Sequence, residues 1–119
     1  MIFGAHLLVY SADAVADRAF FRDVFGWSAV DAGNGWLIFA LPPAETAVHP
    51  ADQASTELYL MSNDLAADMR FLESRGVRLS EVEEAAWGSV TRFRLPGGAR
   101  VGLYQPTHPS PISPGTAQV

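Results

Sequence analysis

The sequence predicts an α+β domain built from two β-α-β-β-β modules, and three observations lead to this prediction. The chain has 119 residues, which is the usual size of one domain. Hydrophobic residue types make up 49% of the chain and charged types 18%, so there is enough apolar material for a core. A segment near the N-terminus also returns in the second half of the chain.

The repeat aligns residues 6–13, with the sequence HLLVYSAD, with residues 57–64, with the sequence ELYLMSND. The same offset of 51 residues pairs Asp17 with Asp68. Further matches follow in the same order along both halves of the chain. A period close to half the chain length predicts that each half folds as the same unit.

The first half is expected to begin with a strand at residues 2–10, because this segment is rich in bulky apolar side chains and too short for a helix. A helix should follow, with Ser11 or Asp13 as its N-cap and Gly26 at its end. The β-rich runs that come next predict three short strands, at residues 27–31, 36–41 and 46–49.

The second half repeats this order, with a first strand at residues 56–62 and a helix capped by Asn63 or Asp64 and ended by Gly76. Its three remaining strands are expected at residues 77–82, 88–95 and 100–105. The domain organisation that follows is one domain at residues 1–106, with modules at about 1–52 and 53–106, and a Pro-rich C-terminal tail at 107–119.

Charge and composition exclude several function classes. The formal net charge is -5 and no Lys/Arg cluster is present, so we expect no nucleic acid and no membrane as a partner. Cysteine is absent, which leaves no disulfides, thiolate metal ligands or thiol nucleophiles. No stretch approaches the ~20 apolar residues of a membrane span, and we expect a cytoplasmic protein.

Three features of the sequence stand together: the paired modules, the Asp and Phe that both helices share, and a Leu-Pro-Gly-Gly turn before a Val-Gly-Leu-Tyr-Gln-Pro strand. In these features the chain resembles the vicinal oxygen chelate (VOC) superfamily. This superfamily includes glyoxalase I, bleomycin-resistance and extradiol dioxygenase proteins. The resemblance covers residues 2–106. It implies that the modules lie edge to edge, that their strands form a curved, U-shaped mixed sheet, and that the helices cover the outside while the concave side holds the site.

Side chains alternate along a strand, so every second residue of each first strand is expected to face this cleft. These residues are His6, Leu8 and Tyr10 in the first module and Glu57, Tyr59 and Met61 in the second. Arg92 alternates with apolar residues and would face the cleft or its rim, where it could receive an anionic ligand. Tyr10, Tyr59 and Tyr104 are expected either to line a ligand slot or to be core aromatics.

The resemblance also implies a possible metal site. Metal-binding members of the family carry one ligand at the start of the first strand and one in the last strand of each module, and the first-strand ligands fall on His6 and Glu57. Both side chains can bind a divalent ion such as Zn, Ni, Fe or Mn. The last-strand positions depart from the family pattern, because one falls on Gly102 and the other near Thr46, next to Glu45. The sequence therefore supplies two of the four expected ligands.

Three functions remain open. The preferred one is a glyoxalase/bleomycin-resistance-like protein that binds a small molecule in the cleft between its modules, without a complete metal site. The first alternative is a metal-dependent lyase, isomerase or dioxygenase with His6 and Glu57 as catalytic residues, or the same two residues as a metal-free acid/base pair. The second is an interaction or regulatory module with a vestigial site. Family habit and the limited core of a short chain predict a homodimer.

Overall fold

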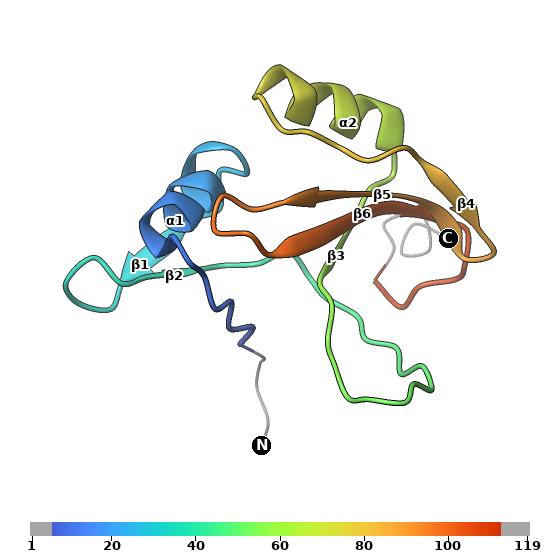
Figure 1. Cartoon of the computed structure of the whole chain (residues 1–119), viewed down its shortest axis with the longest axis horizontal. Helices are drawn as coiled ribbons and strands as arrows, with labels where there is room; N and C mark the ends of the chain where they lie inside the picture. Colours follow the sequence, from blue (N-terminus) through green and yellow to red (C-terminus); the bar gives the residue numbers. More distant parts are fainter. Residues whose placement is uncertain (1–5, 113–119) are drawn as a thin grey trace.

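The computed structural model describes residues 6–112 and has an α+β fold, as the sequence predicts (Figure 1). Its helices are α1 (Ala14–Asp23) and α2 (Leu65–Ser74). A two-stranded antiparallel sheet pairs β1 (Ala29–Asp31) with β2 (Leu37–Phe39). A four-stranded mixed sheet has the order β3-β6-β5-β4, with β3 at Tyr59–Met61, β4 at Glu83–Ala85, β5 at Gly88–Arg94 and β6 at Arg100–Pro106.

Both helices start in the same way, which confirms the repeat at the level of local structure. The Asp13 and Asp64 carboxylates each accept a hydrogen bond at 3.1 Å from the backbone N–H three residues further on. Each aspartate in turn donates its own N–H to the serine two residues before it, Asp13 to Ser11 at 2.9 Å and Asp64 to Ser62 at 3.0 Å. A side-chain cap of this kind stabilises a helix by ~1 kcal/mol.

The second half forms a complete β-α-β-β-β module around the main core. The helix α2 covers one face of β5 and β6, and the buried side chains between them are Leu65, Leu72, Phe93, Leu95, Val101 and Leu103. Leu58 and Leu60 pack against this cluster, as the alternation along the strand predicts. Burying each such side chain contributes about 1.5–3 kcal/mol, so the second half carries most of the hydrophobic stabilisation.

The first half is less complete than the repeat predicts. Its helix α1 packs on the same sheet face as α2, where the Phe20 and Phe25 rings each lie 6.2 Å from Phe93. Residues 46–49 are not a strand, and neither are residues 6–10, the described part of the strand expected at 2–10; residues 2–5 lie outside the described chain. Both expectations are wrong for these residues because a strand needs a hydrogen-bonded neighbour.

One strand of the second half is also displaced from its expected position. The sequence predicts a strand at 77–82, whereas β4 occupies Glu83–Ala85. The earlier residues are used differently: Val77 and Leu79 pack against the core, and the Ser80 N–H donates to the Arg92 carbonyl at 2.9 Å. Residues 77–82 therefore pack against the core through Val77 and Leu79 and are not part of a continuous strand with β4.

Exposure of large apolar side chains is concentrated in the first half. Tyr10 is 86% exposed, Val30 67%, Trp36 67% and Val48 95%. Within residues 6–112, both helices are ten residues long, and neither has the length or the apolar character to cross a membrane.

Candidate functional site

The face of the four-stranded sheet that lies opposite α2 carries the candidate site. Strand pairing places Tyr59 of β3 beside Gly102 of β6, and Gly102 beside Arg92 of β5. Two residues further along β6, Tyr104 is the neighbour of Met61. Directly paired residues project to the same side of a sheet, so these side chains share one face. We call it the aromatic face.

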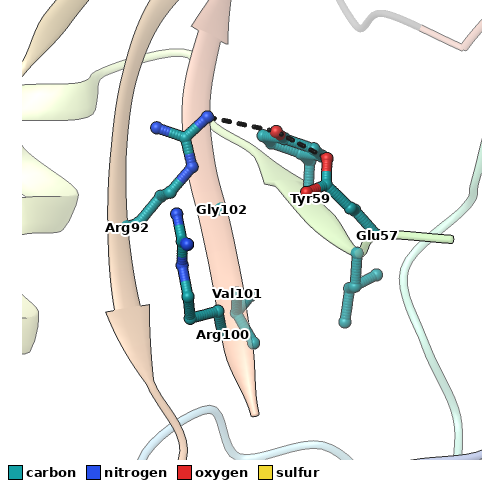
Figure 2. Close-up of a pocket in the computed structure, with 7 residues that line it drawn as sticks. Glu57, Tyr59, Arg92, Arg100, Val101 and Gly102 are labelled. Atoms are coloured by element: carbon teal, nitrogen blue, oxygen red, sulfur yellow. Dashed lines mark hydrogen bonds between the residues drawn. The ribbon is translucent and has the colours of Figure 1, made fainter. Parts of the chain in front are cut away.

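Tyr59 occupies the space over Gly102, as Figure 2 shows. A Cβ atom built on Gly102 would lie 2.5 Å from Cε2 of the Tyr59 ring and closer still to Cδ2. Carbon atoms in contact normally lie ~3.5–4.0 Å apart, so only glycine fits under this ring. The position at which the family resemblance implies a metal ligand is therefore taken by an aromatic ring from the neighbouring strand.

A short chain of hydrogen bonds holds the Tyr59 hydroxyl in place. The hydroxyl donates to Oε1 of Glu57 at 3.0 Å and accepts from Nη2 of Arg92 at 3.2 Å (Figure 2). The bond to Tyr59 is the main cause that raises the pKa of Arg92, and nearby Glu83 and Glu57 act in the same direction. Arg92 therefore keeps its positive charge at the site at all physiological pH values.

Three aromatic rings meet on this face. Trp87, which precedes β5, lies edge-to-face with Tyr59 at 5.9 Å and with Tyr104 at 5.2 Å, and the two tyrosine rings lie 5.8 Å apart. Edge-to-face pairs of this kind contribute about 0.5–1.5 kcal/mol each beyond their buried area. The trio thus forms an aromatic wall, in which the Tyr59 ring is the one that contacts Arg92.

A second polar cluster lies at the far side of Tyr104. The Tyr104 hydroxyl lies 3.1 Å from Nε2 of His108, and the same nitrogen lies 3.8 Å from Oε2 of Glu45. The other Glu45 oxygen accepts a hydrogen bond from the buried Ser110 hydroxyl. Burial, followed by the Glu45 charge, raises the pKa of Tyr104. This cluster fastens the loop that contains Glu45 to the segment after β6.

A small hollow opens beside the Tyr59 ring. Its volume is about 30 Å³, and it is lined by Glu57, Leu58, Tyr59, Arg92, Arg100, Val101 and Gly102. Typical ligand pockets measure about 300–1,000 Å³, so this hollow can hold one polar group of a ligand and not a whole drug-sized molecule.

The candidate residues from the sequence divide into two groups. The structure gathers Glu57, Tyr59, Met61, Arg92 and Tyr104 on or beside the aromatic face. His6, Leu8 and Tyr10 lie instead on the exposed segment before α1. No hydrogen bond or ion pair joins His6 to Glu57 among the described residues.

Sequence reasoning missed several residues of this region. Arg100 lines the hollow, and its position two residues before Gly102 on the same strand was the signal that could have found it. Trp87, beside Gly88, is predicted from the sequence to pack at a sheet edge or dimer surface in preference to stacking on a ligand, whereas the structure places it against Tyr59 and Tyr104. Glu45 was considered only as a neighbour of the ligand position near Thr46, and no local pattern in the sequence predicts its cluster with His108 and Ser110.

The residues present do not fit the metal centre that the fold family implies. The Gly102 position is covered by Tyr59, and an oxygen of Glu57 accepts the Tyr59 hydroxyl proton in a hydrogen bond. Glu45 is engaged with Ser110 and His108. Within residues 6–112, no three His, Asp or Glu side chains are grouped as ion ligands, and a catalytic site needs about three.

Comparison with known proteins identifies relatives only by structure, because neither the protein-family models nor the curated proteins include a match. TnmS3, an antibiotic binding protein from Streptomyces sp. CB03234, is 24% identical, with a TM-score of 0.67 over 90% of this chain and 99% of the other. A glyoxalase/bleomycin resistance protein from the same organism is 25% identical, with a TM-score of 0.58 over 82% and 95%. Lactoylglutathione lyase from Agrobacterium tumefaciens is 18% identical, with a TM-score of 0.59 over 82% and 88%.

Proposed function

The chain has the fold of the vicinal oxygen chelate superfamily, the glyoxalase/bleomycin resistance/dioxygenase proteins, and on that premise we propose that it binds a small aromatic molecule against its aromatic face without a resident metal ion. One observation carries the proposal: the Tyr59 ring lies over Gly102, where a metal ligand would otherwise stand. An aromatic wall with one fixed cation, Arg92, is suited to holding a planar molecule.

The names of the similar structures agree with a binding role. TnmS3 is described as an antibiotic binding protein, and it spans nearly the same length as this chain. Lactoylglutathione lyase is an enzyme of the same fold, so the fold by itself does not decide between binding and catalysis. The residues of this chain, above all Tyr59 and Gly102, are therefore what support binding.

We further propose that the protein acts as a homodimer and that the second copy supplies the opposite wall of the binding site. A hollow of about 30 Å³ cannot enclose a ligand alone. The hairpin β1–β2 exposes the paired side chains Val30 and Ile38, and Tyr10 and Val48 are nearly fully exposed. Exposed apolar side chains that are paired in this way are found at interfaces, and a second copy of the chain is the partner always available to them.

Sedimentation equilibrium tests the dimer, with Val30→Glu as the disrupting variant. We expect a dimer for the unaltered chain and a monomer for Val30→Glu. Phe71→Glu is the matched control, because Phe71 is an exposed aromatic residue on α2, outside the hairpin, and this variant should remain a dimer. A monomeric unaltered chain would overturn this part of the proposal.

A thermal-shift screen against planar aromatic compounds tests ligand binding. A compound present at 100 times its Kd stabilises the folded state by about 2.7 kcal/mol and so raises the Tm by several degrees. The shift should disappear in Tyr59→Leu and persist in Phe71→Leu, which removes an exposed ring elsewhere. A flat result across a wide library would favour an interaction module instead.

Elemental analysis distinguishes the proposal from a metal-dependent enzyme. We expect Zn, Ni, Fe and Mn each well below one equivalent per chain after purification without chelator. Stoichiometric metal that is lost in both His6→Ala and Glu57→Ala would establish the metal-dependent alternative. The same metal in all variants would indicate a site elsewhere, which would overturn the metal-free part of the proposal and leave ligand binding on the aromatic face standing.

A further inference from the structure

Positive charge is concentrated beside the hollow in an otherwise acidic protein. All eight cationic side chains are arginines, against a formal net charge of -5. Three of them share the aromatic face, because Arg94 pairs directly with Arg100 and Arg92 lies two residues from Arg94. Like charges at directly paired positions of a sheet repel one another, so this arrangement favours an anion between them.

The protein itself leaves part of this charge without a partner. Arg94 donates to a backbone carbonyl at 2.9 Å, and Arg92 donates to the Tyr59 hydroxyl at 3.2 Å. The carboxylate of Glu83 lies 3.7 Å from Arg92, but its side chain is 71% exposed and its charge is screened by solvent. Within residues 6–112, the Arg100 guanidinium donates no hydrogen bond and has no carboxylate within 4.0 Å.

We propose that Arg92 and Arg100 form a subsite for the carboxylate group of the aromatic ligand, an inference that rests on the proposed function. Figure 2 shows both side chains on the same side of β5 and β6 as the Tyr59 ring. The hollow that they line measures about 30 Å³, which suffices for about two water-sized atoms, such as the two oxygens of a carboxylate. A guanidinium group donates paired hydrogen bonds that match this planar group.

The aromatic wall defines where the rest of the ligand lies. Tyr59 separates the hollow from Trp87 and Tyr104, so a ring attached to the carboxylate extends over these side chains. The acidic side chain that lines the hollow is Glu57, which is exposed and whose carboxylate already accepts a hydrogen bond from the Tyr59 hydroxyl. The subsite therefore selects a flat aromatic acid over an uncharged or cationic analogue.

Titration by two-dimensional ¹H–¹⁵N NMR tests this subsite, with sodium benzoate as the probe at constant ionic strength. Benzamide serves as the uncharged compound of the same shape. We expect benzoate to shift the amide signals of Gly102 and Arg92 saturably and to bind at least fivefold more tightly than benzamide. Arg100→Gln should weaken benzoate binding at least fivefold. Arg70→Gln, an equal charge change at an exposed position of α2, should change it less than twofold.

The outcomes separate this inference from the proposed function. Equal affinity for benzoate and benzamide on the aromatic face would overturn the carboxylate subsite and leave ligand binding standing. Equal effects of Arg100→Gln and Arg70→Gln would show that benzoate follows net charge only, which also overturns it. If neither compound shifts these signals, the subsite is wrong, whereas the proposed function is judged by the wider thermal-shift screen.

Discussion

Substitution of Gly102 by alanine tests the central feature of the candidate site. The new Cβ atom would lie 2.5 Å from Cε2 of Tyr59, about 1 Å inside the normal contact distance. The ring would therefore have to move, and its hydroxyl would lose its alignment with Arg92 and Glu57. The contacts of the ring with Trp87 would weaken as well.

The expected magnitude follows from three contributions. Overpacking of this kind costs ~1–3 kcal/mol. The hydrogen bonds of the Tyr59 hydroxyl add little, because Glu57 is exposed and water replaces it. Replacing glycine by alanine reduces the freedom of the unfolded chain and returns ~0.4–1 kcal/mol. We therefore expect Gly102→Ala to lower the free energy of unfolding by about 1–2 kcal/mol.

A double-mutant cycle with Tyr59→Ala isolates the steric effect. Once the ring is gone, Gly102→Ala should be neutral or stabilise the protein by about 0.5 kcal/mol. Urea unfolding followed by tryptophan fluorescence measures all four proteins. If Gly102→Ala has the same effect with and without the Tyr59 ring, the ring does not occupy this position and the reasoning fails.

Three further variants or titrations probe the rest of the fold. Asp17→Ala removes the buried carboxylate that accepts the Gly97 N–H at 2.6 Å, so urea unfolding should show a loss of about 1.5–3 kcal/mol, and an unchanged midpoint would contradict this role. Glu45→Ala leaves the buried Ser110 hydroxyl without its acceptor and should lose about 1–2 kcal/mol, most of which Glu45→Gln should restore. The Tyr104 phenol should titrate above its ordinary pKa of 10.0 when ultraviolet absorbance is followed at alkaline pH, and a pKa below 10.0 would contradict this. The free energy of unfolding should fall as pH rises above 10.0, because the unfolded chain releases this proton first.

Local signals in the sequence predicted the elements that depend on local interactions. The caps Asp13 and Asp64 are set by a side chain and the backbone three residues on, and both are found where expected. Strands β5 and β6 pair with each other across a short turn, so their pattern and their partner lie in one stretch of chain. Short-range information was sufficient for these parts.

The features that the sequence could not predict depend on neighbouring strands that are far apart in the chain. Residues 6–10 have the apolar pattern of a strand, as do their counterparts around β3, yet only the latter run beside a neighbour, β6. Arg100 becomes a site residue only through its position next to Gly102 and Arg92 in the folded sheet. A repeat in sequence therefore specifies the local unit, and the available neighbour decides whether the unit completes its sheet.

The pair formed by Gly102 and Tyr59 explains why the aromatic face and a metal centre exclude each other in this chain. Tyr59 can lie against β6 only because position 102 has no side chain, and a His or Glu at 102 would occupy the volume that the ring now fills. Restoring a ligand at 102 would therefore also require a small residue at 59, which would remove the ring that contacts Trp87 and accepts the hydrogen bond from Arg92. Gly102→His alone should destabilise the protein without creating a metal site, whereas Gly102→His with Tyr59→Ala should regain stability and lose aromatic ligand binding. Metal affinity in the single variant, with the thermal stability of the unaltered chain, would show that the ring and the ligand can coexist and would remove the physical basis for this exclusion.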